Sequence, residues 1–85
     1  MDIFVRRALQ EECEYMQWAD TWESDCTKFD YYYETDETCL ITKGSATVKY
    51  DGKEVSLGEG DLAVFPKGLK CTWIVHTPIK KFLRN

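Results

Sequence analysis

Histidine is almost absent from this sequence, which has a single one, His76, in 85 residues. Cysteines stand at positions 13, 26, 39 and 71, and no two of them form a Cys-x-x-Cys pair. Structural zinc sites are built from closely spaced Cys and His ligands. The sequence therefore argues against a zinc-stabilised fold. Strand alternation places His76 on the face opposite Cys71 and Trp73, so we do not expect it to be a metal ligand.

Long apolar runs and clusters of basic residues are also lacking. No run approaches the roughly 18 apolar residues that a membrane span needs, and the first residues lack the basic-then-apolar order of a secretory signal. We expect a cytoplasmic protein with free thiols, and a secreted chain with two disulfides is the alternative. The net charge of −4 argues against nucleic acid as a partner. We expect neither a membrane nor a nucleic acid partner.

What the sequence does have is enough apolar and aromatic residues for a folded core. Apolar residues make up 44% of the chain and aromatic residues 14%. A chain of this length predicts one domain over residues 1–85, with a thin core because a small domain buries a modest share of its surface.

Short alternating segments dominate the chain after its first twenty residues. Residues 2–7 alternate as a strand, and Leu9, Cys13 and Met16 recur at helical spacing within 8–20.

The clearest local signal after that is Asp51-Gly52 between two alternating runs, which predicts a type I′ hairpin turn. Gly44 is read as the end of one strand, and the segment from Pro78 as a separate short strand or tail. About eight short strands between Gly, Asp and Pro turns predict an all-β sandwich or barrel.

Two motifs carry a family resemblance. The string "ETCLITKG" (37–44) has six residues between a glutamate and a glycine, and "GDLAVFPKG" (60–68) has five residues between a glycine and Pro-x-Gly. Together they resemble the two motifs of the cupin superfamily. The longer pattern over residues 22–82 is similar to the small single-domain cupins grouped with ureidoglycine aminohydrolase and the ethanolamine-utilisation cupins.

The resemblance implies an all-β, cupin-type small β-barrel (an RmlC-like jelly roll) of six to nine strands, with a short helical segment near the N-terminus. Cupins normally hold a metal with three histidines and a glutamate. The matching positions here are Tyr31, Tyr33, Cys71 and Glu37. A spacing to Glu37 longer by one residue would put Asp30 and Tyr32 at the first two positions instead. Only the glutamate is retained, so we expect no tightly bound metal and no cofactor.

A rescued metal site is one alternative. Cys39 lies two residues after Glu37, on the same strand face, and these two could converge with Cys71 and a tyrosine to hold zinc or copper. We favour the reading in which both cysteines are small core residues.

Glu37 is the candidate catalytic residue. On the inner face of a small barrel, a carboxyl must be paired, hydrogen-bonded or kept neutral, and Tyr31 or Tyr33 could donate the hydrogen bonds. Such a group would be a candidate general acid or base. A surface glutamate at the barrel mouth is the equal alternative.

The aromatic residues are too many for one thin core, and alternation divides those around the first motif between two faces. The full set is Trp18, Trp22, Phe29, Tyr31, Tyr32, Tyr33, Phe65 and Trp73. Because Tyr and Trp are enriched at interfaces, we expect a homodimer. Residues 1–40 hold most of the acids and 41–85 most of the bases, which could help two copies associate.

For function, we expect a module that binds a small polar ligand, with a cationic or amine-bearing molecule as one candidate, without a tightly bound metal. Its pocket would be lined by Tyr31, Tyr33, Glu37, Cys71 and Trp73. One alternative is a metal-dependent enzyme resembling ureidoglycine aminohydrolase, acting on a ureido or amino acid derivative. Another is an assembly piece without chemistry of its own. The sequence leaves open whether the protein is an enzyme.

Overall fold

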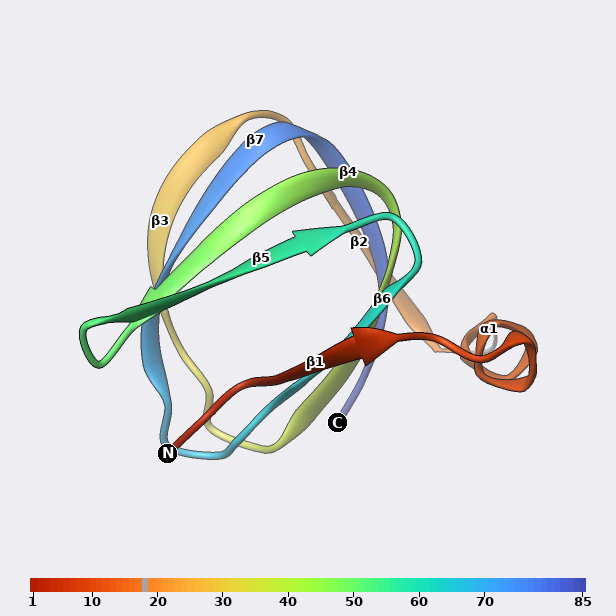
Figure 1. Ribbon diagram of the computed structural model, residues 1–85, viewed down its shortest axis with the longest axis horizontal. Helices are drawn as coiled ribbons and strands as arrows, with labels where there is room; N and C mark the ends of the chain where they lie inside the picture. Colours follow the sequence, from red (N-terminus) through yellow and green to blue (C-terminus); the bar gives the residue numbers. More distant parts are fainter. Residues whose placement is uncertain (18) are drawn as a thin grey trace.

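Strands make up most of the computed structural model, which describes residues 1–17 and 19–85. The elements are β1 (Phe4–Arg7), α1 (Gln10–Met16), β2 (Asp20–Ser24), β3 (Thr27–Tyr32), β4 (Glu37–Tyr50), β5 (Lys53–Gly58), β6 (Asp61–Phe65) and β7 (Lys70–Arg84). Figure 1 shows the strands curling round a barrel, with α1 standing outside it. The all-β cupin-type barrel and its short N-terminal helix are confirmed. Trp18, one of the aromatic residues considered above, lies outside the described residues.

Two long strands form the middle of the sheet. β4 and β7 pair antiparallel along most of their length. On its other side, β4 pairs first with β6 and then with β5, and β1 extends the sheet from β6. β7 pairs with β3 along its first half and with β2 along its second half. Each long strand therefore joins two parts of the barrel wall.

The division of these long strands into shorter ones was wrong. β4 continues through Gly44, and β7 continues through Pro78. Register shifts between Ile41 and Ala46 bend the pair at this point. Gly44 has φ of 84°, and a Cβ there would lie 2.2 Å from the Pro78 carbonyl oxygen. The glycine therefore marks a bulge where two backbones approach closely, because only a residue without a side chain fits there.

The hairpin prediction is confirmed. Asp51 and Gly52 have φ of 48° and 72°, and Tyr50 pairs with Lys53 across the turn. Positive φ at both central residues defines the type I′ turn, whose twist matches that of the flanking strands.

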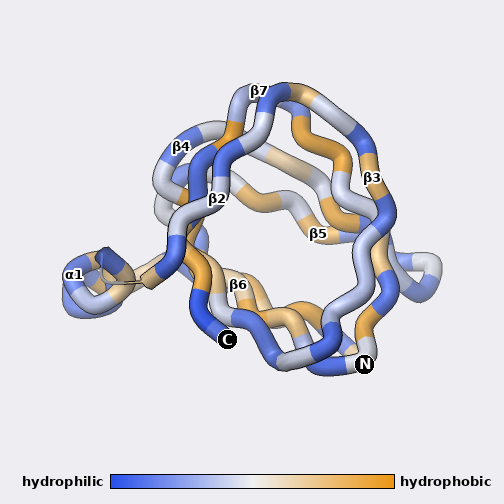
Figure 2. The backbone as a smooth tube through the Cα atoms, turned by 180° about the vertical axis from the view of Figure 1, so that it is seen from behind, coloured by the Kyte–Doolittle hydropathy of each residue, from blue (hydrophilic) through white to orange (hydrophobic). Residues whose placement is uncertain are grey.

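Alternation along the strands divides the molecule into an inside and an outside. Figure 2 shows hydrophobic and hydrophilic residues alternating around the barrel wall. The buried inner residues form one apolar cluster, which includes Cys39, Phe65 and Trp73. A smaller cluster outside the wall joins Met16 of α1 to Leu40 and to neighbouring apolar side chains.

The helix was predicted with one residue misplaced. Leu9 precedes α1 and is 59% exposed, so it does not share the packed face of Met16.

None of the helices in the described residues is long and apolar enough to cross a membrane. The four cysteines are all free. The homodimer and the cytoplasmic location stay predictions.

Candidate functional site

A buried pair of opposite charges lies inside the barrel. Glu37 begins β4, and Lys81 lies in the second half of β7; each is 6% exposed. The sheet register places Lys81 opposite Ile41, so the lysine side chain runs back along β4 to reach the carboxylate. Lys81 Nζ donates a hydrogen bond to Glu37 Oε2 at 3.3 Å. The pair satisfies two charges that would each be costly to bury alone.

Aromatic rings surround the ammonium group. Lys81 Nζ lies 4.4 Å from the ring centroid of Trp73, 5.1 Å from that of Trp22 and 6.0 Å from that of Phe65. Ring faces attract a cation most strongly where water is excluded. The lysine is therefore held by one carboxylate and by the faces of its aromatic neighbours.

A second polar contact fixes the walls of the site. Trp73 Nε1 donates a hydrogen bond to Tyr33 Oη at 3.2 Å, and Tyr33 stacks on Phe65 with ring centroids 4.7 Å apart. Burial, and next the charge of Glu37, raise the pKa of Tyr33 far above its ordinary value. Tyr33 is therefore a neutral phenol at every physiological pH. Tyr31 packs edge-on against it and is 45% exposed, so Tyr31 lies at the mouth of the site.

These side chains enclose a small space, which we call the interior cavity. It has a volume of about 80 Å³. Its lining residues are Trp22, Phe29, Tyr31, Tyr33, Glu37, Trp73, Lys81 and Leu83. Since a water molecule takes up about 30 Å³ in the liquid, the cavity suits two or three waters or one very small molecule. The pocket predicted from the sequence is therefore small, but its side chains do not fill it completely.

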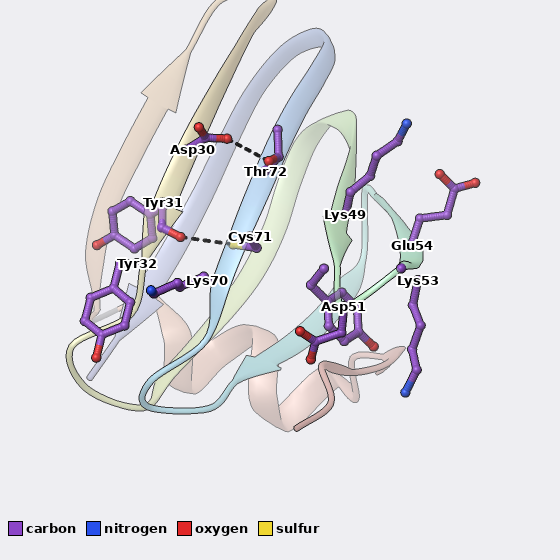
Figure 3. Close-up of a pocket in the computed structure, with 12 residues that line it drawn as sticks. Asp30, Tyr31, Tyr32, Lys49, Asp51, Lys53, Glu54, Lys70, Cys71 and Thr72 are labelled. Carbon is purple, nitrogen blue, oxygen red and sulfur yellow. Dashed lines mark hydrogen bonds between the residues drawn. The ribbon is translucent and has the colours of Figure 1, made fainter.

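A larger depression, which we call the outer groove, lies between the β4–β5 hairpin and the facing ends of β3 and β7. Its volume is about 1000 Å³, and it is lined by residues 30–32, 49–54 and 70–72. Figure 3 shows lysines and acids distributed around it, with Tyr31 and Tyr32 on the β3 side. Tyr31 lines both the groove and the cavity.

The predicted site residues separate between these two places. Tyr33, Glu37 and Trp73 line the interior cavity, and Tyr31 stands at its mouth. Cys71 is not among the lining residues of the cavity: it lines the outer groove, and its thiol donates to the Tyr31 carbonyl oxygen at 3.6 Å. Cys71 pairs with Tyr31 near the start of β7, two residues nearer that end of the strand than Trp73, which pairs with Phe29.

The surface alternative for Glu37 is wrong, since its side chain is buried. Its partner is also different from the one expected. Tyrosine hydroxyls were the predicted donors to this carboxyl, whereas the recorded donor is the ammonium of Lys81.

Lys81 is the residue that sequence reasoning missed, although a signal was present. Ile79 is 2% exposed and Leu83 packs against the inner cluster, so the intervening alternate residue also points inward. A lysine between two inward apolar residues should have been matched with an inward acid. Reading the segment from Pro78 as a short strand or tail hid this alternation.

The residues at the family's metal positions do not fit a metal ion. Glu37 is paired with Lys81, and Tyr33 is a neutral phenol that accepts from Trp73. Burial raises the pKa of Cys71 to about 11 and that of Cys39 to about 12, so both thiols stay protonated at neutral pH. Thiolates, not thiols, ligate metals.

No other set in the described residues replaces these ligands. No group of three or more His, Cys, Asp or Glu side chains among them is arranged to hold a metal. Cys39 and Cys71 belong to the apolar core cluster, as expected for small core residues. His76 is exposed, and its Nε2 lies 2.7 Å from Thr47 Oγ1.

Comparison with known proteins places this barrel in a family. The family model described as EutQ-like cupin domain matches residues 10–82. The structure is similar to that of a DUF861 family protein from Thermotoga maritima, at 34% identity and a TM-score of 0.93, with 98% of each chain covered. A comparison with curated proteins gave no match.

More distant likenesses show the fold alone. The EutQ protein of Clostridium difficile is 22% identical, with a TM-score of 0.71 over 95% of this chain and 64% of that one. A putative ethanolamine utilization protein from Salmonella typhimurium is 18% identical, with the same TM-score, over 95% of this chain and 66% of that one. Because the family model covers most of the sequence, the chain belongs to the family of EutQ-like cupin domains.

Proposed function

We propose that this protein binds a small polar molecule in the interior cavity, at a site whose fixed cation is the ammonium group of Lys81 rather than a metal ion. The observation that carries the proposal is the buried Lys81–Glu37 pair, 3.3 Å apart, which lines a cavity of about 80 Å³. Two charged side chains in an otherwise aromatic pocket supply the few convergent polar groups that binding sites use.

The chemistry of the pair favours a ligand with an oxygen acceptor. An ammonium group has three N–H donors, and Glu37 accepts one of them. A small carboxylate or carbonyl compound could accept another in a site shielded from water. A cationic ligand is disfavoured, because Lys81 already occupies the position over the Trp73 and Trp22 rings. The ligand class is therefore the opposite of the amine-bearing one suggested by the sequence.

Ligand titrations test this proposal directly. Formate and acetate are small anions, and methylammonium is a cation of similar size. Each would be titrated while amide and aromatic NMR signals are followed. We expect saturable shifts of the Trp73 and Tyr33 signals with the carboxylates and none with methylammonium. Lys81→Met should abolish the shifts, whereas Lys80→Met, at an exposed neighbour, should keep them. Shifts that persist in Lys81→Met would overturn the proposal.

The metal-dependent aminohydrolase has no observation in its favour. Its Lewis-acid chemistry needs open metal coordination, and the donor set described above does not provide it. Elemental analysis of protein purified without an affinity tag separates the two hypotheses. We expect less than about a tenth of an equivalent of any transition metal, because a carboxylate and a neutral phenol bind such ions weakly. A stoichiometric metal that Glu37→Gln removes would favour the enzyme instead.

A further inference from the structure

We propose that Lys81 is a nucleophilic amine that forms an imine with a small aldehyde or ketone in the interior cavity. This inference rests on the proposed function, because it needs the same cavity to admit a carbonyl compound. It adds a covalent step and a substrate class that simple binding does not require.

The cavity brings together what imine formation needs. The first requirement is a primary amine, and Lys81 lines the cavity with its side chain 8% exposed. The second is a group that can take and return a proton, and Glu37 Oε2 lies 3.3 Å from Nζ. The third is an apolar wall that limits water, and Trp22, Phe29 and Trp73 supply it. Lysines held in apolar surroundings are known nucleophiles toward carbonyl carbon.

The step balances without any redox partner. The ammonium of Lys81 gives one proton to the Glu37 carboxylate, which leaves a neutral amine. The nitrogen lone pair attacks the carbonyl carbon, and the C–N bond forms as the C=O bond opens to an alkoxide. One proton then moves from the nitrogen to this oxygen, which gives the neutral carbinolamine. The Glu37 carboxyl then protonates the carbinolamine hydroxyl, which leaves as water as the C=N bond forms. Hydrolysis reverses each step.

The cavity also sets the size of the carbonyl compound. A volume of about 80 Å³ equals that of two or three water molecules in the liquid, so only the smallest carbonyl compounds fit. Glycolaldehyde, which has two carbons and two oxygens, is among the smallest aldehydes, whereas benzaldehyde exceeds this volume. The exposed lysines of the outer groove have no such restriction, so size separates reaction in the cavity from reaction at the surface.

Trapping with cyanoborohydride tests the inference. The protein would be incubated near pH 7 with glycolaldehyde and cyanoborohydride, which delivers hydride to a C=N bond, and the modified lysines would be located by peptide mass spectrometry. We expect Lys81 to be modified at least about tenfold faster than its neighbour Lys80, because Glu37 lies beside Lys81 Nζ to take and return the proton and the cavity holds the aldehyde next to the amine.

Matched variants locate the chemistry. Lys80→Arg should leave the fast modification unchanged, and Lys81→Arg should remove it. Glu37→Gln should slow the modification and change its pH profile, which a purely structural role would not do. Benzaldehyde should modify Lys80 and spare Lys81. Since Lys81→Arg could disturb folding, protection of wild-type Lys81 by saturating formate gives a second test without mutation.

The outcomes separate this inference from the proposed function. If formate shifts the Trp73 signal but Lys81 is modified no faster than Lys80, the imine is overturned and the binding site stands. If neither occurs, both are wrong. Fast modification of Lys81 that formate blocks supports both.

Discussion

The interior cavity and the outer groove differ in size and in how far their charged side chains are exposed to solvent. The groove is more than ten times larger, about 1000 Å³ against about 80 Å³, and it contains six charged residues. Those charges stand at the surface, where water and salt screen them. The cavity contains two charges, and both are buried. By volume, the groove would be the candidate ligand site. The buried charges make the cavity the candidate instead.

This difference teaches where chemistry can arise in a small barrel. A solvated lysine such as Lys70 behaves like any surface amine, and its neighbours can be changed at little cost. Lys81 is held by a carboxylate and by ring faces in a buried site. Its hydrogen bonds are therefore stronger than those of a lysine in water. Tyr31 lines both places, so a small molecule in the groove would meet the cavity mouth there.

The largest predicted effect comes from breaking the buried pair on one side. Lys81→Met should lower the free energy of unfolding by about 3–5 kcal/mol, because it leaves the Glu37 carboxylate buried without a partner. Urea denaturation measures this loss. Lys80→Met, which removes a lysine that is 45% exposed, should change it by less than about 1 kcal/mol.

A double variant sharpens the same comparison. Combining Glu37→Leu with Lys81→Met removes both charges and should recover most of the stability, since apolar replacements of a buried pair are often neutral. If Lys81→Met alone costs no more than Lys80→Met, the pair is not desolvated as described.

Alkaline pH should give the next largest effect. Burial raises the pKa of Cys39 to about 12 from 9.0. Above pH 9 the unfolded thiol loses its proton while the folded one keeps it, so folding stability falls as pH rises. The slope is about 1.4 kcal/mol per pH unit for one thiol.

The measurement is the free energy of unfolding from pH 8 to 11. Cys39→Ala should flatten the curve by that slope. The pKa of Cys71 is also raised, to about 11, so Cys71→Ala should flatten the curve as well, over a narrower pH range. An unchanged slope in Cys39→Ala would show that this thiol titrates normally.

A smaller effect is expected from the hydrogen bond in the cavity wall. Tyr33→Phe removes the acceptor of Trp73 Nε1 and should cost about 1–3 kcal/mol, because a buried donor is left unsatisfied. Tyr32→Phe makes the same chemical change on a side chain that is 51% exposed in the groove. Thermal unfolding should place Tyr32→Phe within about 0.5 kcal/mol of the wild type. If the two variants lose the same free energy of unfolding, the hydrogen bond in the cavity wall is no more important than a hydroxyl exposed in the groove.

The smallest effect belongs to the groove itself. Lys70→Ala should change the free energy of unfolding by less than about 0.5 kcal/mol and leave formate binding in place. If it abolishes formate binding instead, the ligand site is the groove.

The sequence predicted the parts of the fold that depend on local chemistry. Asp51-Gly52 predicted its turn because positive φ at two successive positions is a local requirement. Strand length depends on tertiary pairing: β4 continues past Gly44 where it pairs with β5, and β7 continues past Pro78 where it pairs with β2. Pattern alone could not reveal that pairing.

The candidate site divides in the same way. Alternation placed Trp73 on the same face as Cys71, and both are buried. It left Glu37 open between the inner face and the barrel mouth. The partner of Glu37 is Lys81, which lies 44 positions away in the chain. Their contact depends on the register between β4 and β7, which alternation within one strand does not give. Cys71 shares the alternation of Trp73 but lines the groove, and alternation gives the face of a strand without telling which of two spaces along it a side chain reaches.

The most direct test follows the Nζ signals of ¹⁵N-labelled lysines while metal-free protein is titrated with formate. We predict that the Lys81 signal shifts saturably, that Glu37→Gln changes its position, and that the signals of the other lysines stay in place. A Lys81 signal that does not respond, or a response that needs an added divalent metal, would contradict the assignment of Lys81 as the cation of this barrel.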